Sequence, residues 1–183
     1  DEAELGRIVA AQLEREIAFQ GADTVAAFIA EPIQGAGGVI VPPANFWPLV
    51  REICSRHGVL LIADEVVTGF GRGGAMFGTR LWDVKADLWC LAKGISSGYI
   101  PLGATAISGR VAEVFDADAT GAGQVSHGYT YSAHPVACAA AIATLELFQR
   151  EALFQRAGEM GKLLGDAFHS TFKGLPNVIG IRS

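Results

Sequence analysis

The apolar positions of this chain follow two kinds of pattern, one typical of helices and one typical of buried strands. From Leu5 to Ile17 they recur at the spacing of an amphipathic helix. The sequence predicts a second helix from about Asn45 to Arg56, an alanine-rich one from Pro135 to Arg150, and a last one from Glu151 to Phe172. Helices are therefore expected at the start of the chain and over much of its later part.

Short continuous apolar runs indicate strands that are covered on both faces. These runs span residues 25–30, 59–63, 87–92 and 102–107, and a further one is expected at 178–181. The predicted helix after Pro42–Pro43 lies between the first two runs, which predicts a βαβ unit with parallel strands. A loop of small residues is expected from Asp116 to Gln124.

A polar residue that could do chemistry follows each of the first three strands: Glu31, Asp64 and Lys93. The carboxyl ends of parallel strands share one rim, and ligands bind at that rim in open α/β sheets. Lys93 also opens a glycine- and serine-rich loop. An aspartate and a lysine there suit pyridoxal phosphate (PLP), because the lysine can hold its aldehyde and the carboxylate can keep its pyridine nitrogen protonated. Considered alone, a lysine in this setting is more often an exposed strand-terminal residue, and the neighbouring segments are what favour the chemical role.

Composition excludes several other classes of function. The chain has 183 residues, half of them apolar, and a net charge of −5 with both signs scattered. It has no basic stripe, so nucleic acid is not an expected partner. We expect no membrane span, no secretion signal and no metal-ligand cluster. Cys54, Cys90 and Cys138 lie far apart in apolar sequence and are predicted to be reduced, which favours a cytoplasmic protein.

One glycine-rich segment suggests a rival enzyme class. The glycine spacing of residues 69–74 matches the dinucleotide-binding fingerprint, which would indicate an NAD-dependent oxidoreductase. That fingerprint needs a strand that runs directly into the glycines and then a full helix. Here residues 64–68 intervene, and Ala75 to Gly78 is too interrupted by glycine for a long helix. The oxidoreductase interpretation is therefore weak.

Four segments resemble the class III, or omega, aminotransferases. In chain order they are Ala30–Pro43, Ala63–Arg72, Ala92–Ala104 and His127–Pro135. The likeness extends from the first residues to the last and is nearest to the amine- or ω-amino-acid:pyruvate branch. It implies an α/β fold like that of aspartate aminotransferase (PLP fold type I), with a mainly parallel sheet and flanking helices. It also implies a homodimer with PLP at the subunit boundary. Residues 1–150 would be the latter part of the PLP-binding large domain, and residues 151–183 a connecting helix and the start of the C-terminal small domain.

The resemblance also assigns roles to single residues. Lys93 would form the internal aldimine and move the proton between the α-carbon and the cofactor, while Asp64 would bind the pyridinium nitrogen. Val66 would pack against one face of the ring, and Thr130 would bind the phosphate of the opposite subunit's cofactor. Thr130 also precedes the predicted helix start, where free amides bind anions, although an ordinary turn residue is the alternative. Glu31 would lie beside the cofactor or serve as a structural loop carboxylate.

Three nearby positions refine this picture. Glu65 should point to the side of the strand opposite Asp64 and act in packing or an ion pair. Val67 stands where 4-aminobutyrate and ornithine enzymes usually have glutamine, which favours the amine:pyruvate branch. Gly73–Gly74 stand where many relatives have Thr-Gly, and we expect a looser loop.

The function implied by the resemblance is PLP-dependent transamination from an amine or ω-amino acid to a keto acid such as pyruvate. A 4-aminobutyrate or diamino-acid aminotransferase, or a related decarboxylase or racemase, is the alternative within the PLP enzymes. Family chains are more than twice as long, so we expect a fragment without the main phosphate loop, the ring-stacking aromatic residue and the late arginine. A catalytically silent truncated fragment is the alternative of another class, and the fragment alone is expected to be inactive.

Overall fold

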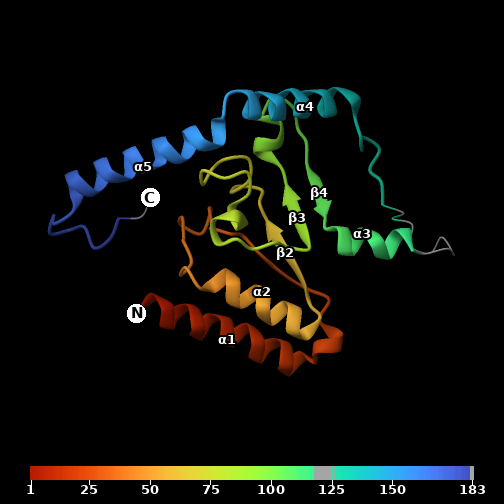
Figure 1. Cartoon of the computed structure of the whole chain (residues 1–183), viewed down its shortest axis with the longest axis horizontal. Coiled ribbons are helices and arrows are strands. Elements are labelled where there is room, and N and C mark those ends of the chain that lie inside the picture. The colour runs from red at the N-terminus through yellow and green to blue at the C-terminus, as the bar shows by residue number, and fades with distance from the viewer. Residues whose placement is uncertain (118–124, 126, 182–183) are drawn as a thin grey trace.

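A single sheet of four strands organises the protein (Figure 1). The structure is a computed structural model that describes residues 1–117, 125 and 127–181. The strands are β1 (Ala27–Ala30), β2 (Leu60–Asp64), β3 (Leu88–Leu91) and β4 (Ala104–Ile107), in the spatial order β1-β2-β3-β4. The first three strands are parallel, as the βαβ pattern predicts, and β4 runs antiparallel to β3.

The described part of the chain has five α-helices. They are α1 (Glu2–Gln20), α2 (Phe46–His57), α3 (Gly109–Asp116), α4 (Pro135–Arg150) and α5 (Leu153–Phe172). Four of them confirm the predicted helices. The sequence did not indicate α3, and most of the loop predicted to follow it lies outside the described residues. The strand expected at 178–181 is wrong, since these residues take no regular structure and pair with no described strand.

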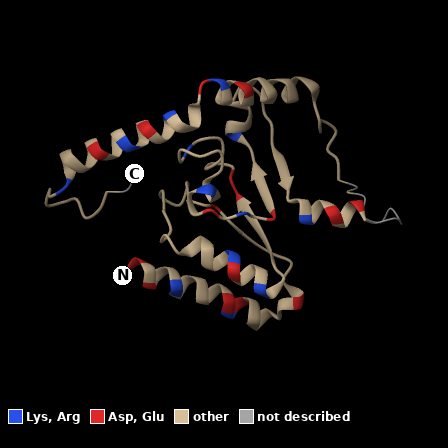
Figure 2. Ribbon diagram, viewed as in Figure 1, with Lys and Arg blue, Asp and Glu red and all other residues tan. Residues whose placement is uncertain are grey.

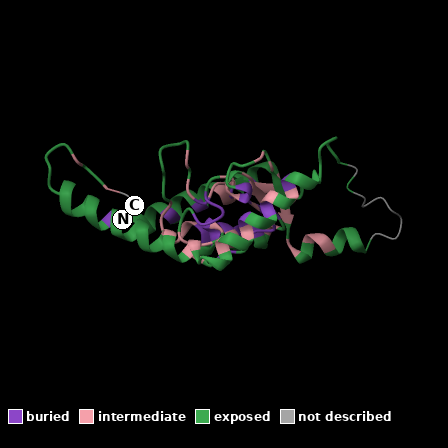
Figure 3. Cartoon of the chain, turned by 90° about the horizontal axis from the view of Figure 1, so that it is seen from above, coloured by how far each residue is buried: buried purple, intermediate pink, exposed green. Residues whose placement is uncertain are grey.

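The main core lies between α2 and the sheet. The α2 side chains Trp47, Val50, Ile53 and Cys54 are all buried, which confirms the face predicted to meet the sheet. The Trp47 indole N–H donates to the carbonyl of Pro32, so the ring is fixed as well as buried. Figure 3 shows the buried residues concentrated in the middle of the molecule.

Helix α1 packs on α2 (Figure 1). Glu14 of α1 binds both Arg56 and His57 at the carboxyl end of α2. His57, with the charge of Arg56, lowers the pKa of the Glu14 carboxyl. Short 3-10 helices complete the fold: η1 (Ala22–Thr24), η2 (Gly78–Trp82) and η3 (Lys93–Ser96).

A smaller core joins α4 to the loops beyond the sheet. Phe70, Ile95 and Ala141 pack together there, which places η3 against α4. Helix α5 continues from α4 and is exposed over most of its length (Figure 3). Acidic and basic residues both occur along α1, α2 and α5 in Figure 2. Among the described residues, no helix combines the length and apolar character needed to cross a membrane, and no group of three or more His, Cys, Asp or Glu side chains could hold a metal ion.

Candidate active site

The carboxyl ends of β1, β2 and β3 place three predicted site residues on one rim of the sheet. Glu31 follows the last residue of β1, Asp64 is the last residue of β2, and Lys93 is the second residue after β3. The register aligns Ala30 with Ala63 and Asp64 with Cys90. The placement predicted from the parallel strands is therefore confirmed, while the chemical roles of these residues stay predictions.

Asp64 is half-buried at this rim. Its Oδ1 atom accepts a hydrogen bond from the backbone N–H of Val66 at 3.1 Å. This contact bends the chain after β2 and turns the half-buried Val66 into the loop. The pKa of the neighbouring Cys90 thiol is raised, first by burial and second by the negative charge of Asp64.

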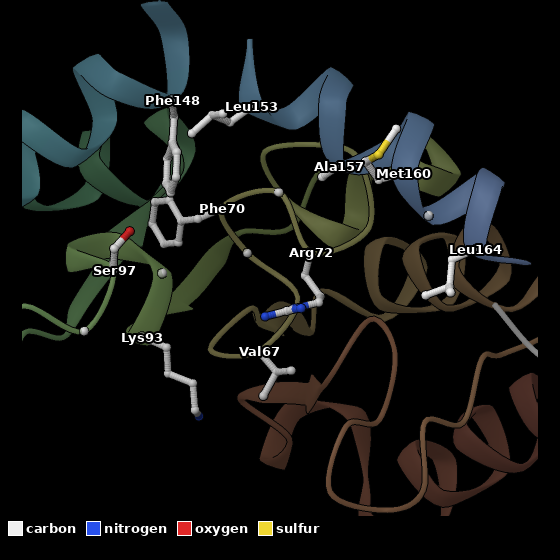
Figure 4. A pocket seen from close by; sticks show the side chains of 15 residues that line it. Val67, Phe70, Arg72, Lys93, Ser97, Phe148, Leu153, Ala157, Met160 and Leu164 are labelled. Carbon is white, nitrogen blue, oxygen red and sulfur yellow. The ribbon is translucent and has the colours of Figure 1, made fainter. Parts of the chain in front are cut away.

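Lys93 is exposed and begins η3 with a φ of 44°, in the left-handed region that side-chain-bearing residues rarely adopt. Its side chain lines a cleft of about 980 Å³. Val67, Phe70 and Arg72 line the same cleft from the loop after β2, and Met160 lines it from α5 (Figure 4). The volume lies at the upper end of the range typical of small-molecule sites, and most of the lining is apolar.

Glu31 and Asp64 line a neighbouring cleft of about 670 Å³. Glu31 uses its Oε2 atom to accept a hydrogen bond from the backbone N–H of Gly35 at 2.9 Å, which closes the loop after β1. Gly35 lies against the Val67 side chain, so the loops after β1 and β2 meet there. The contact of Glu31 is that of the structural loop carboxylate considered from the sequence, and within the described ranges no hydrogen bond uses its Oε1 atom.

Thr130 does not line either of these clefts. It is exposed, in the turn that leads into α4, and its neighbours Tyr129 and Tyr131 line a third hollow with Pro101 and Leu102. The helix start predicted at His134–Pro135 is confirmed, with the proline at the first helical position. The structure thus brings Glu31, Asp64 and Lys93 together at one rim and leaves Thr130 on a separate surface.

Sequence reasoning missed two features of the loop after β2. Arg72, to which no role was assigned, lines the Lys93 cleft. Gly74 has a φ of 84°, and a Cβ there would lie 2.9 Å from the Cα of Gly158 on α5, whereas the looser loop expected from Gly73 stays a prediction. Glycine permits this close approach of loop and helix. The only sequence signal for this contact was the presence of Gly74, and its partner Gly158 is far along the chain.

The groups at the rim have the chemistry that PLP requires. Of the two carboxylate oxygens of Asp64, only Oδ1 forms a hydrogen bond with another described residue. The Oδ2 atom can therefore accept a hydrogen bond from a ring N–H. The Lys93 amine is exposed in a cleft large enough for a cofactor and substrate. Val67 lines the cleft beside Lys93, and Val66 is bonded through its N–H to Asp64. Asp64, Lys93 and these valines therefore fit the cofactor.

Comparison with known proteins agrees with this chemistry. The family model described as aminotransferase class-III matches residues 3–183. The omega-amino acid–pyruvate aminotransferase of Pseudomonas putida is 44% identical over 180 residues, which are 97% of this chain and 40% of that protein. The diaminobutyrate–2-oxoglutarate transaminase of Halomonas elongata is 42% identical over 181 residues, 99% of this chain and 39% of that protein.

A solved structure extends the comparison to three dimensions. The amine transaminase from an uncultivated Pseudomonas species, in its PLP-bound internal aldimine form, is 54% identical and superposes with a TM-score of 0.88. The superposition covers 93% of this chain and 38% of that one. The chain thus spans about two fifths of the length of these proteins.

Proposed function

Because this chain belongs to the class-III aminotransferases, a family of PLP-dependent enzymes of fold type I, we propose that it supplies the lysine and aspartate of a transamination site. The observation that carries the proposal is the parallel pairing of β2 with β3, which puts Asp64 and Lys93 on one rim. The reaction moves an amino group from an amine or ω-amino acid to a keto acid such as pyruvate. Val67 supports this branch, since an apolar side chain lines the cleft beside Lys93.

Each residue of the site has a defined task in this proposal. PLP, when bound, supplies an aldehyde and a ring that withdraws electrons from the substrate's α-carbon. The Lys93 Nζ atom would hold the aldehyde of PLP and would move the proton of the substrate's α-carbon. The Asp64 carboxylate holds the proton on the pyridine nitrogen, and Val66 packs on the ring. Glu31 contacts the cofactor or substrate through its Oε1 atom.

The experiment for this proposal is reduction of the PLP-loaded, full-length protein with borohydride, followed by peptide mapping. We expect the pyridoxyl group on Lys93. Lys85 and Lys162 serve as internal controls, since Lys162 is exposed and already paired with Asp166 on α5. A label on either of them, with Lys93 unmodified, would contradict the assignment.

A 4-aminobutyrate or diamino-acid aminotransferase is the second candidate function. The similarity to the Halomonas elongata protein favours it almost as much as the Pseudomonas putida protein favours the first, at 42% against 44% identity. Activity with a panel of amines and diamino acids, each tested with pyruvate and with 2-oxoglutarate, distinguishes the two. Turnover confined to 2-oxoglutarate would support the second candidate.

We also propose a cytoplasmic homodimer in which Thr130 reaches the phosphate of the partner subunit's cofactor. In support, Thr130 is exposed and lies just before the amino end of α4, where unpaired backbone N–H groups favour an anion. Mixing Lys93→Ala subunits with Thr130→Val subunits tests the sharing of sites. A mixed dimer has one site with both defects and one with neither, so activity should exceed that of either variant alone.

A further inference from the structure

Glu65, the residue after Asp64, is fully buried and receives four hydrogen bonds. Its Oε2 atom accepts from the Thr68 hydroxyl at 2.5 Å and from the Gly78 N–H at 2.7 Å. Its Oε1 atom accepts from both the N–H and the hydroxyl of Thr79, each at 2.9 Å. No Lys or Arg in the described part of the chain forms an ion pair with it. Each oxygen accepts from a backbone N–H, which can only donate.

These contacts fasten the two ends of one loop to a single side chain. Residues 66–77, here called the rim loop, leave the sheet after Asp64 and return at η2. Thr68 lies near the start of the rim loop, and Gly78 and Thr79 follow its end. A buried carboxylate that is hydrogen-bonded at every position resists displacement, because moving it would leave polar groups unpaired away from water.

The backbone of Glu65 connects the same residue to the neighbouring strand. Its N–H donates to the carbonyl of Cys90 at 3.0 Å, and its carbonyl accepts from the Gly69 N–H at 2.9 Å. Cys90 is aligned with Asp64 in the sheet and lies three residues before Lys93. Glu65 thus joins the strand end with Asp64, the strand that leads to Lys93, and the rim loop.

The rim loop also contacts the backbone next to Lys93, through Phe70 and Gly94. A Cβ added to Gly94 would lie 2.8 Å from the Cβ of Phe70, so these two residues are in direct contact. Phe70 and Lys93 have φ values of 59° and 44°, in the left-handed region that is unfavourable for residues other than glycine. Such conformations persist only where the surrounding structure holds them. The Phe70 N–H donates to the carbonyl of Met76, which closes the rim loop on itself.

From these contacts we propose that Glu65 is a positioning residue for the reaction at Asp64 and Lys93. It fixes the rim loop, and the rim loop holds Asp64 through the Val66 N–H and holds the Lys93 backbone through Phe70. The inference rests on the proposed transamination. It assigns no contact between Glu65 and the substrate or cofactor.

The hydrogen bonds specify the substitution that tests this role. Each carboxylate oxygen of Glu65 accepts one backbone N–H and one hydroxyl. The Thr68 and Thr79 hydroxyls can rotate and accept instead, but the N–H groups of Gly78 and Thr79 can only donate. Glu65→Gln preserves the side-chain size and forces its NH₂ against one of these two N–H groups. The rim loop must then shift, whichever way the amide is turned.

The experiment compares PLP-loaded, full-length parent and Glu65→Gln proteins in single-turnover half-reactions. Visible circular dichroism of the cofactor is recorded as a measure of its orientation. We expect the half-reaction rate to fall about 10–100-fold, because small misplacements of reacting groups have effects of that size. The dichroism should change and KM should change less than the rate. Glu113→Gln, which alters an exposed carboxylate on α3, should match the parent.

Two milder substitutions keep the test decisive if Glu65→Gln does not fold. Thr68→Val and Thr79→Val each remove one hydroxyl donor and keep the backbone N–H groups, so the double variant should lower the rate and alter the dichroism to a smaller extent. Variants that melt at a lower temperature but retain the parent's rate and dichroism would show that Glu65 is only structural. A parent that has no half-reaction would overturn the proposed function itself, and the positioning role with it.

Discussion

At the scale of a single residue, Asp64 has a structural role in the backbone and an electrostatic effect on its neighbours. Its Oδ1 atom shapes the backbone by accepting the Val66 N–H, and its charge acts on its surroundings strongly enough to help raise the pKa of the Cys90 thiol. An asparagine at position 64 can keep the first interaction through its carbonyl oxygen, but it has no charge. The local fold and the chemistry of this residue can therefore be separated by one substitution.

We predict that Asp64→Asn retains PLP and slows removal of the substrate's α-proton by about 100-fold or more, a size typical for the loss of one electrostatic contact at a reacting group. The neutral amide cannot stabilise a protonated pyridine nitrogen, on which electron withdrawal by the ring depends. Single-turnover kinetics with a deuterated amine measures the step. A variant that reacts at the parent's rate would make Asp64 a structural carboxylate.

At the scale of elements, Asp87 joins three of them just before β3. Its carboxylate accepts from the Leu61 N–H of β2, from Arg51 of α2 and from Arg110 of α3, each at 2.8 Å. Burial acts to raise the pKa of Asp87, but these hydrogen bonds and the two positive charges outweigh burial and lower it. The stabilisation is present above the ordinary pKa of 3.8 and is lost as the pH falls through the lower, folded-state value.

We predict that Asp87→Asn lowers the free energy of unfolding by about 2 kcal/mol at neutral pH, the scale of hydrogen bonds to a charged group. The thermal midpoint should fall by about 4–8 °C. Below pH 3.8 the difference between variant and parent should shrink, because protonation removes the same charge from the parent. Asp83→Asn is the matched control, since Asp83 is exposed and asparagine tolerates its left-handed φ. Equal midpoints for Asp87→Asn and the parent would contradict the role of Asp87.

Element patterns explain which parts of the fold the sequence could predict. Helix α4 was predicted to begin near Pro135 and to reach Arg150, and it does, because the proline begins it and an alanine-rich segment continues it. Helix α3 has eight residues, begins at a glycine and lacks a side-chain cap, so its signal is weak. The apolar residues 178–181 resemble a strand, but a strand also requires a partner, which periodicity does not report.

The same distinction applies to the candidate site. Asp64 and Lys93 were predictable at one rim because the parallel direction follows from the βαβ pattern. The partners of Glu65 were not, since Gly78 and Thr79 approach it from 13 and 14 residues further along the chain. The alternation of the strand predicted only that Glu65 points away from Asp64 and acts in packing or an ion pair. Gly74 and Gly158, which also meet, are separated by a still longer stretch of sequence, so this contact was not predictable either.

At the scale of the whole molecule, α5 presents an apolar surface to solvent. Its exposed apolar side chains are Met160, Leu163, Leu164, Phe168 and Phe172. Met160 and Leu164 of this surface also line the Lys93 cleft. The chain spans about two fifths of the length of its similar proteins, so this surface and the cleft are where we propose that further protein is needed to complete the site.

We predict that the 183-residue chain expressed alone does not catalyse transamination and self-associates. It contains Lys93 and Asp64, but it spans about two fifths of the length of its relatives, so we expect both the binding energy and the orientation of PLP to be reduced. Exposed apolar area of this kind favours association between copies. Size-exclusion chromatography, a PLP titration and a pyruvate-coupled amine assay measure the three properties. Leu163→Gln with Phe168→Gln should shift the chain toward the monomer without restoring activity, whereas a monomeric parent chain that binds PLP tightly and turns over would show that these residues alone form a complete site.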